Sequence, residues 1–217
     1  MTPPLLFDLD GTLVDSRAVV ERQWRRLCAR LGLDFAEVLK VLHGMRSADT
    51  IRAVAPGVDA DVEAALLDAA EQADAEGLEV VPGAREVLAG LPSGSWGIVT
   101  SGHRELAQGR LRAVGLPVPE VMVCGDEVAS GKPDPEGFLT GARLLGVPPE
   151  TCVAVEDAPA GIRAARAAGM PVVGITTTHP ANVLAGASAV IADLTGFDAA
   201  LAALVGAAPG GPSSPRQ

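Results

Sequence analysis

The stretch Leu5-Leu6-Phe7-Asp8-Leu9-Asp10-Gly11-Thr12-Leu13-Val14-Asp15 decides the fold of this chain. A short apolar run ends in two acids, Asp8 and Asp10, and Gly-Thr follows at once, a pattern that predicts a buried strand. Ligands of parallel sheets collect at the carboxyl ends of strands, where these two side chains would lie. Because two buried carboxylates need a cation or a proton to offset their charge, the stretch indicates a divalent metal, acid–base chemistry, or both.

The same stretch is compatible with two other structures. In the first, Asp10-Gly11 is an ordinary surface turn. In the second, Asp-X-Asp-Gly opens a calcium loop, which needs a third oxygen ligand two residues after the glycine and a closing Glu. Leu13 and Val19 occupy those positions, so the calcium loop is excluded.

The rest of the chain alternates short apolar runs with helical patterns. This alternation predicts an α/β fold, with a Rossmann-like parallel-sheet core covered on both faces. The predicted strands are 5–7, 96–99, 121–124, 152–155, 172–175 and 190–192, and helical patterns lie at 83–91, 105–114, 135–145 and 161–168.

Residues 16–79 interrupt this rhythm, because they contain no convincing strand. Val20, Trp24, Leu27, Cys28 and Leu31 follow one helical face, Gly32 ends that helix, and further helices are expected from 47 and over 59–76. These helices either pack on the sheet or form an inserted all-helical cap domain with hinges near 15–17 and 79–82. We expect the cap, with a core formed by 1–15 and 80–206 and a disordered tail at 207–217, which is rich in Gly, Pro and Ser.

Composition narrows the possible partners. The chain has 217 residues and a formal net charge of −10, and it has no basic cluster, so nucleic acid is not an expected partner. No apolar stretch reaches membrane-spanning length and no signal peptide is evident, so we expect a cytoplasmic protein without a membrane partner, a monomer or weak homodimer. The three cysteines are widely spaced and are expected to be reduced core residues.

Three further predicted strand ends carry polar residues. Thr100-Ser101-Gly102 offers hydroxyls and backbone N–H groups that suit phosphate oxygens, although Ser and Thr also cap helices. Lys132 lies between Gly131 and Pro133, where a compact charge suits an anion site better than it suits a solvated loop. Glu156-Asp157 is a second acidic pair, suited to a hard cation such as Mg²⁺, although Asp157 could also cap the helix that follows.

Taken together, Asp8-Leu-Asp10-Gly-Thr-Leu-Val, Thr100, Lys132 in Gly-Lys-Pro-Asp-Pro and Glu156-Asp157 resemble the four ordered motifs of the haloacid dehalogenase superfamily of phosphohydrolases. The resemblance covers nearly the whole chain, and the helical insert corresponds to that family's cap. It implies a Mg²⁺-dependent phosphatase in which Asp8 is the nucleophile that forms an aspartyl-phosphate. Asp10 would be the general acid and then the general base.

The same resemblance implies the remaining roles at the site. Mg²⁺ would be held by the Asp8 carboxylate, the Asp10 carbonyl and Asp157, with Glu156 either a ligand or behind the ligands. Thr100, the Ser101 amide and Lys132 would hold the transferring phosphoryl oxygens. The dehalogenases of the superfamily lack the second acid, so Asp10 favours a phosphate ester over a carbon–halogen bond.

The substrate implied by the resemblance is a small phosphorylated metabolite such as a glycerol phosphate or a sugar phosphate. Arg46 could contact its distal group, with His43 shaping the loop and Arg104 nearby; packing or solvated roles remain alternatives for all three. Arg46→Ala tests this expectation, because an unchanged kcat/KM would contradict it. A phosphomutase of the β-phosphoglucomutase type and a phospho-accepting signalling module remain the rival functions.

Overall fold

The computed structural model describes residues 2–206, and the tail predicted at 207–217 lies outside them. Its main sheet has six parallel strands in the order β5-β4-β1-β6-β7-β8. The strands are β1 (Leu5–Phe7), β4 (Trp96–Val99), β5 (Val121–Val123), β6 (Val153–Glu156), β7 (Val172–Ile175) and β8 (Ala189–Ile191). All six predicted strands are therefore present, with bounds that differ by at most one residue at either end.

Helices cover both faces of the sheet, as predicted. Successive side chains of β1 point to opposite faces, so Leu5 and Phe7 enter one core while Leu6 enters the other. The first core is shared with α5 (Ala84–Gly90), α6 (Arg104–Ala113) and α9 (Phe197–Gly206), and the second with α7 (Glu136–Leu145) and α8 (Pro159–Ala167). The α/β, Rossmann-like fold class is confirmed.

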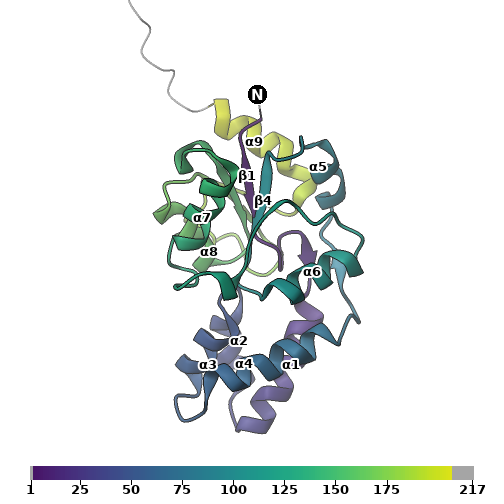
Figure 1. Ribbon diagram of the computed structural model, residues 1–217, viewed down its shortest axis with the longest axis vertical. Helices are drawn as coiled ribbons and strands as arrows, with labels where there is room; N and C mark the ends of the chain where they lie inside the picture. The colour runs from purple at the N-terminus through teal and green to yellow at the C-terminus, as the bar shows by residue number, and fades with distance from the viewer. Residues whose placement is uncertain (1, 207–217) are drawn as a thin grey trace, which may run out of the picture.

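The helices between residues 16 and 79 lie to one side of the sheet, at its carboxyl-end edge (Figure 1). They are α1 (Arg17–Leu31), α2 (Phe35–Leu42), α3 (Ser47–Val54) and α4 (Ala60–Gln72). Gly32 ends α1 with a φ of 68°, and the Asp59 side chain caps α4 by accepting from the Asp61 and Val62 amides. These helices bury a hydrophobic cluster of their own, centred on residues such as Trp24 and Ile51.

Two short strands join these helices to the sheet region. β2 (Val14–Asp15) pairs antiparallel with β3 (Glu79–Val80), so the chain leaves and returns through adjacent segments. Neither strand was predicted, nor was α2, because two-residue strands carry no periodic signal and acquire their partner only in the folded chain.

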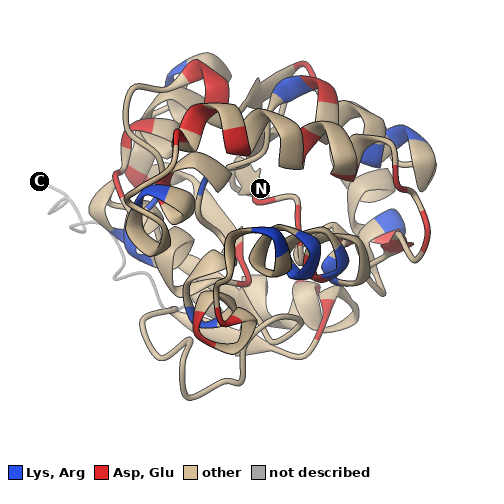
Figure 2. Cartoon of the chain, turned by 90° about the horizontal axis from the view of Figure 1, so that it is seen from below, with Lys and Arg blue, Asp and Glu red and all other residues tan. Residues whose placement is uncertain are grey.

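The described residues confirm one other expectation. Cys28, Cys124 and Cys152 are buried and unpaired by disulfides. Figure 2 marks the acidic and basic positions on the helices seen from below, with several of the basic positions along a single helix. Among residues 2–206, no helix is both long and apolar enough to cross a membrane.

Candidate active site

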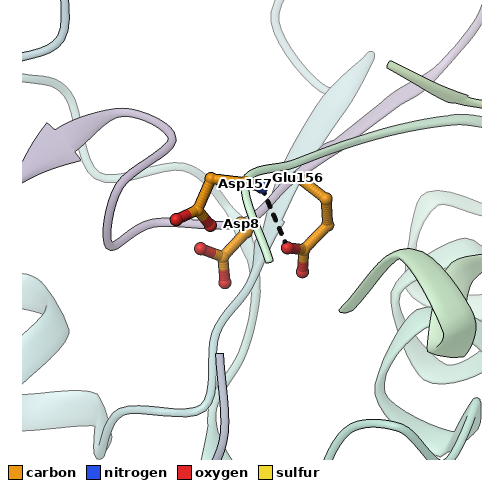
Figure 3. Close-up of side chains that lie close together, drawn as sticks. All are labelled: Asp8, Glu156 and Asp157. Carbon is orange, nitrogen blue, oxygen red and sulfur yellow. Dashed lines mark hydrogen bonds between the residues drawn. The ribbon is translucent and has the colours of Figure 1, made fainter. Parts of the chain in front are cut away.

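Three buried carboxylates meet at the carboxyl-end edge of the sheet. Asp8 follows β1, and Glu156 and Asp157 lie at the end of the neighbouring strand β6 (Figure 3). Their exposed fractions are 3%, 0% and 1%, and each offers an oxygen within 4.8 Å of the others. Pairing of β1 with β6 thus brings together two acidic pairs that lie almost 150 residues apart in the sequence.

Lys132 provides positive charge within this cluster. Its Nζ donates to Asp8 Oδ1 at 2.5 Å and to Glu156 Oε1 at 2.6 Å. The lysine is itself buried; burial alone would lower its pKa, but the two carboxylates raise it, so the ammonium stays charged. This burial excludes the alternative of a solvated loop lysine, and the role of Lys132 at an anion site stays a prediction.

Burial dominates the titration of the acids. It raises the pKa of Asp8 to about 7, with Lys132 opposing the shift and Glu156 adding to it. Burial also raises the pKa of Asp157 well above its ordinary value, with Asp8 and Glu156 adding to the effect. Lys132 supplies one positive charge against three carboxylates, so a further bound cation would bring the net charge of the cluster closer to zero.

Glu156 and Asp157 are held in different ways. Glu156 Oε1 is used by Lys132, and Oε2 accepts from the backbone amides of Asp157 and Ala158. Asp157 accepts from the Thr178 hydroxyl and, at 3.5 Å, from that of Thr12. Asp157 does not cap α8, whose N-cap is Ala158 without a side-chain cap, so the alternative capping role is wrong.

Two glycines make room for these acids. Gly11 has a φ of +85°, and a Cβ there would overlap the Asp157 carboxylate. A Cβ at Gly161, in the first turn of α8, would overlap the carboxylate of Glu156. The positions of both carboxylates therefore require glycine at residues 11 and 161, because any side chain there would occupy the same space.

Strand β4 brings Thr100 and Ser101 to the same edge of the sheet. Thr100 is buried, and its Oγ1 accepts from the Gly102 amide at 3.1 Å. The Ser101 hydroxyl donates at 2.8 Å to the carbonyl of Gly44, in the loop between α2 and α3. The N-cap of α6 is His103 and has no side-chain cap bond, so neither hydroxyl has the alternative capping role.

Asp10 faces a cation that we did not predict. Arg110 Nη1 on α6 lies 2.6 Å from Asp10 Oδ1, and Arg110 Nη2 lies 2.5 Å from Glu71 Oε2 on α4. Arg110 and Glu71 are only 4% and 6% exposed. A signal was available in the sequence: Arg110 continues the apolar helical face of Leu106 and Ala107, where a charge requires a partner.

A cavity of about 70 Å³ lies between this edge and the inserted helices. Asp8, Asp10, Thr100 and Ser101 line its sheet side, and His43 lines its helix side. The remaining lining residues are Gly11, Ser16, Arg17, Val20, Trp24, Leu42, Gly44, Met45, Ser47, Asp68, Glu71, Gly102, Leu106, Arg110 and Thr178.

Three predicted substrate-binding residues lie outside the lining of this cavity: Lys132, which belongs to the acidic cluster described above, Arg46 and Arg104. Arg46 pairs with Asp49 at 2.6 Å and donates to the carbonyls of Val128 and Ala129, 3.2 and 3.4 Å away. Arg104 pairs with Glu127 on the surface. No feature of the sequence indicates where the loops run that these two guanidinium groups contact. The contacts therefore could not be predicted from the sequence.

His43 lies against a second histidine. Its ring and that of His179 are 5.9 Å apart and nearly perpendicular. Burial lowers the pKa of His43 to about 4, and His179 adds to the shift, so His43 is neutral at physiological pH. This favours a packing or hydrogen-bonding role over a role as a cation.

The acidic cluster fits a bound Mg²⁺. Asp8 and Asp157 supply buried carboxylate oxygens, the ligands that Mg²⁺ prefers. Burial raises the pKa of both acids, a shift that a divalent ion would reverse. Glu156 belongs to the same cluster, and its oxygens accept from Lys132 and from the Asp157 amide, so it fits either a ligand position or a position behind the ligands.

The fold and this site define a hydrolase class with a buried acid after the first strand of a Rossmann-like sheet. The chain belongs to the haloacid dehalogenase-like hydrolases, whose family model matches residues 5–169. It is thus an enzyme, of the phosphoric monoester hydrolase type that its relatives represent.

Three curated relatives are named phosphatases or phosphohydrolases. Hexitol phosphatase A of Escherichia coli K12 is 44% identical over 78% of this chain and 81% of its own. The 2-deoxyglucose-6-phosphate phosphatase 2 of Saccharomyces cerevisiae is 37% identical, over 88% of this chain and 87% of its own. Glycerol-1-phosphate phosphohydrolase 2 of the same yeast is 35% identical, over 82% and 76%.

Solved structures share the whole fold. A hydrolase from Pseudomonas syringae superposes with a TM-score of 0.83 at 26% identity, over 94% of this chain and 99% of its own. A β-phosphoglucomutase from Clostridium difficile gives 0.80 over the same shares at 20% identity, a likeness of fold alone.

Proposed function

We propose that this enzyme is a Mg²⁺-dependent phosphatase that hydrolyses small phosphate monoesters through a phosphorylated Asp8. The observation that carries the proposal is the buried cluster in which Asp8 contacts Lys132 and lies beside Asp157. The Asp8 carboxylate lies at the edge of a cavity, where it could attack phosphorus. Lys132 beside it would offset the negative charge of the phosphoryl group that Asp8 then carries.

The reaction has two steps. An Asp8 carboxylate oxygen forms a bond to phosphorus while the ester P–O bond breaks, and Asp10 gives a proton to the departing alkoxide. Water then attacks the phosphorus of phosphorylated Asp8 and gives a proton to Asp10. Inorganic phosphate leaves, and the Asp8 carboxylate is restored.

Charge around the phosphoryl group is balanced by several groups. Asp8, Asp157 and the Asp10 carbonyl would hold Mg²⁺, which when bound offsets negative charge on the phosphoryl oxygens. Lys132, the Thr100 hydroxyl and the Ser101 amide would bind those oxygens as well. The Ser101 hydroxyl is occupied by Gly44, which supports the amide as the donor from this residue.

The remainder of the cavity supports an uncharged, hydroxylated substrate tail. Asp68 and Ser47 line it, with the Ser47 hydroxyl donating to Asp68, and the nearby cation Arg110 is already paired with Asp10 and Glu71. The other cation of the lining, Arg17, is paired with Asp15. A second anionic group on the substrate would thus meet carboxylates rather than free cations, which favours glycerol or sugar phosphates over esters with acidic tails.

We further propose that residues 16–79 are a cap that moves relative to a core of 1–15 and 80–206. The separate hydrophobic cluster of α1 to α4 and the paired β2 and β3 connections support this division. Opening of the cap would admit substrate to a cavity of only about 70 Å³, and closure would exclude water. A cytoplasmic monomer or weak homodimer remains our expectation.

Phosphate release from a panel of esters tests the function. The panel comprises glycerol, hexitol, hexose and 2-deoxysugar phosphates, each assayed with Mg²⁺, with EDTA and with Asp8→Asn. We expect Mg²⁺-dependent release that Asp8→Asn abolishes. Isomerised product without phosphate release would indicate the phosphomutase, and a stable phosphoryl-Asp8 without turnover would indicate the signalling module; either would contradict the proposal.

A matched pair of esters tests the substrate class. Glycerol 1-phosphate and 3-phosphoglycerate differ chiefly in a hydroxymethyl group against a carboxylate, and we expect a strong preference for the former. Asp68→Asn should narrow this preference by about tenfold, as the loss of one unfavourable charge contact predicts. Asp61→Asn, on the exposed face of the same helix, is the control. An equal kcat/KM for both esters in the unmodified enzyme would contradict this part of the proposal.

A further inference from the structure

Arg110 occupies a position that the proposed chemistry does not explain. It projects from α6 into the cavity wall with only 4% of its surface exposed, and it contacts two carboxylates. Burying a guanidinium is costly unless both its charge and its N–H groups find partners. A buried arginine in contact with the proposed general acid therefore calls for a specific role.

The Asp10 carboxylate has few other restraints. Asp10 Oδ1 is buried and makes no aligned hydrogen bond to the described residues, so its close contact is the ion pair with Arg110 at 2.6 Å. The carboxylate side chain keeps 25% of its surface exposed toward the cavity. Without Arg110, rotation of this side chain would be limited only by the cavity walls.

Arg110 is in turn held from the inserted helices. Glu71 on α4 accepts from Arg110 Nη2 at 2.5 Å, and α4 packs along α6. Like Arg110, Glu71 lies on the buried face of its helix, one turn after Leu67 and Asp68. The chain Asp10–Arg110–Glu71 therefore runs from the sheet edge through α6 to α4.

We propose that Arg110 is a positioning residue that holds Asp10 in line with the leaving oxygen, and that Glu71 makes this positioning depend on the placement of α4. This inference rests on the proposed function, because it needs Asp10 as the proton donor. A guanidinium with two terminal nitrogens is suited to the task, since Nη1 forms an ion pair with Asp10 while Nη2 donates to Glu71. Docking of α4 against α6 would then complete the acid only when the cavity is covered.

Leaving-group dependence separates this role from a structural one. An alkyl ester such as glycerol 1-phosphate needs a proton on its departing alkoxide, whereas p-nitrophenyl phosphate releases a stable anion and does not. For Arg110→Gln, we expect kcat/KM to fall at least about tenfold on the alkyl ester and to stay within about threefold on the aryl ester. Because kcat/KM covers steps only up to formation of phosphorylated Asp8, later hydrolysis does not obscure the comparison.

Further variants complete the test. Arg112→Gln, on the same helix and with a side chain that donates to Gln108 among residues 2–206, should match the unmodified enzyme on both esters. Glu71→Gln should show a smaller loss in the same direction as Arg110→Gln. Should Arg110→Gln fail to fold because Glu71 is left buried and unpaired, the double variant Arg110→Gln/Glu71→Gln removes that cause and should show the same contrast between esters.

Each result decides the inference. Equal losses on both esters, or no loss on either, would overturn the positioning role of Arg110. An alkyl-specific loss in Arg110→Gln with an unchanged Glu71→Gln would overturn the link to α4. Failure of the unmodified enzyme to hydrolyse either ester with Mg²⁺ would instead refute the proposed function, so the two failures are distinguishable.

Discussion

Replacing Lys132 with methionine tests the charge balance of the site directly. Lys132 Nζ lies 2.5 Å from Asp8 and 2.6 Å from Glu156, and all three side chains are at most 5% exposed. Methionine keeps much of the length and apolar volume of the lysine stem but removes its charge. The substitution therefore leaves two buried carboxylates without their shared cation.

The expected magnitude follows from this burial. Removing one partner of a buried ion pair costs about 3–5 kcal/mol, whereas an exposed pair contributes about 0–1 kcal/mol. Lys40, paired with Glu37 on the surface, provides the matched control. We expect Lys132→Met to lower the free energy of unfolding by about 3–5 kcal/mol and Lys40→Met by less than about 1 kcal/mol.

Urea denaturation at neutral pH with EDTA measures both variants, and phosphate release measures activity. We expect Lys132→Met to lower kcat by about 100-fold or more, because it removes a preorganised charge from the phosphoryl site. Part of its lost stability should return when Mg²⁺ replaces EDTA. A destabilisation below about 1 kcal/mol, equal to that of Lys40→Met, would refute the view that Lys132 neutralises the buried acids.

Three further predictions concern other parts of the molecule. Gly161→Ala should destabilise the protein by about 1–3 kcal/mol in urea denaturation, although alanine normally favours a helix, because its Cβ overlaps the Glu156 carboxylate; a gain in stability would contradict this packing. Mg²⁺ at about 100 times its Kd should raise the free energy of unfolding by about 2.7 kcal/mol, and Asp157→Asn should reduce that gain; equal gains in both proteins would remove Asp157 from the ligand set. The pKa of Asp74 is lowered to about 2, chiefly by the Arg22 hydrogen bond, so its stabilising effect is complete above about pH 4 and is lost as the pH falls through 2. The melting temperatures of Asp74→Asn and the unmodified protein should accordingly differ at pH 7 and converge towards pH 2, and a constant difference would rule out this linkage.

The sheet was predictable chiefly because its central strands β1, β4, β6 and β7 are buried on both faces. Such strands are continuous apolar runs, for example Leu5–Phe7 and Val172–Ile175, and these signals survive without knowledge of partners. Asp8, Lys132 and Asp157 were predictable for a related reason, since they follow such strands or lie in a rigid Gly/Pro segment. The meeting of Asp8 with Asp157 required only the rule that parallel strands share one carboxyl-end edge.

Other features depend on partners that the sequence does not place. The β2 and β3 strands have two residues each and pair across the whole helical insert. Arg46 was expected at the substrate, but its guanidinium meets backbone carbonyls about 80 residues away, whose direction depends on the path of one loop. Carbonyl positions in loops leave no mark in residue type, so this contact had no signal.

Arg110 and Glu71 show how a site residue can be visible in a sequence without a motif. Each continues an apolar helical face, on α6 and α4 respectively, where a lone charge would be expelled or would destabilise the helix packing. Two such charges of opposite sign, on helices that pack together, form an ion pair with each other, and Arg110 also pairs with a third group, Asp10. A charged residue on an apolar helical face departs from the usual pattern of amphipathic helices, and such departures are expected at functional sites. A charge at such a position therefore indicates a partner of opposite charge. For this enzyme, that reasoning extends the proposed site beyond its four motifs to α6 and the inserted helices.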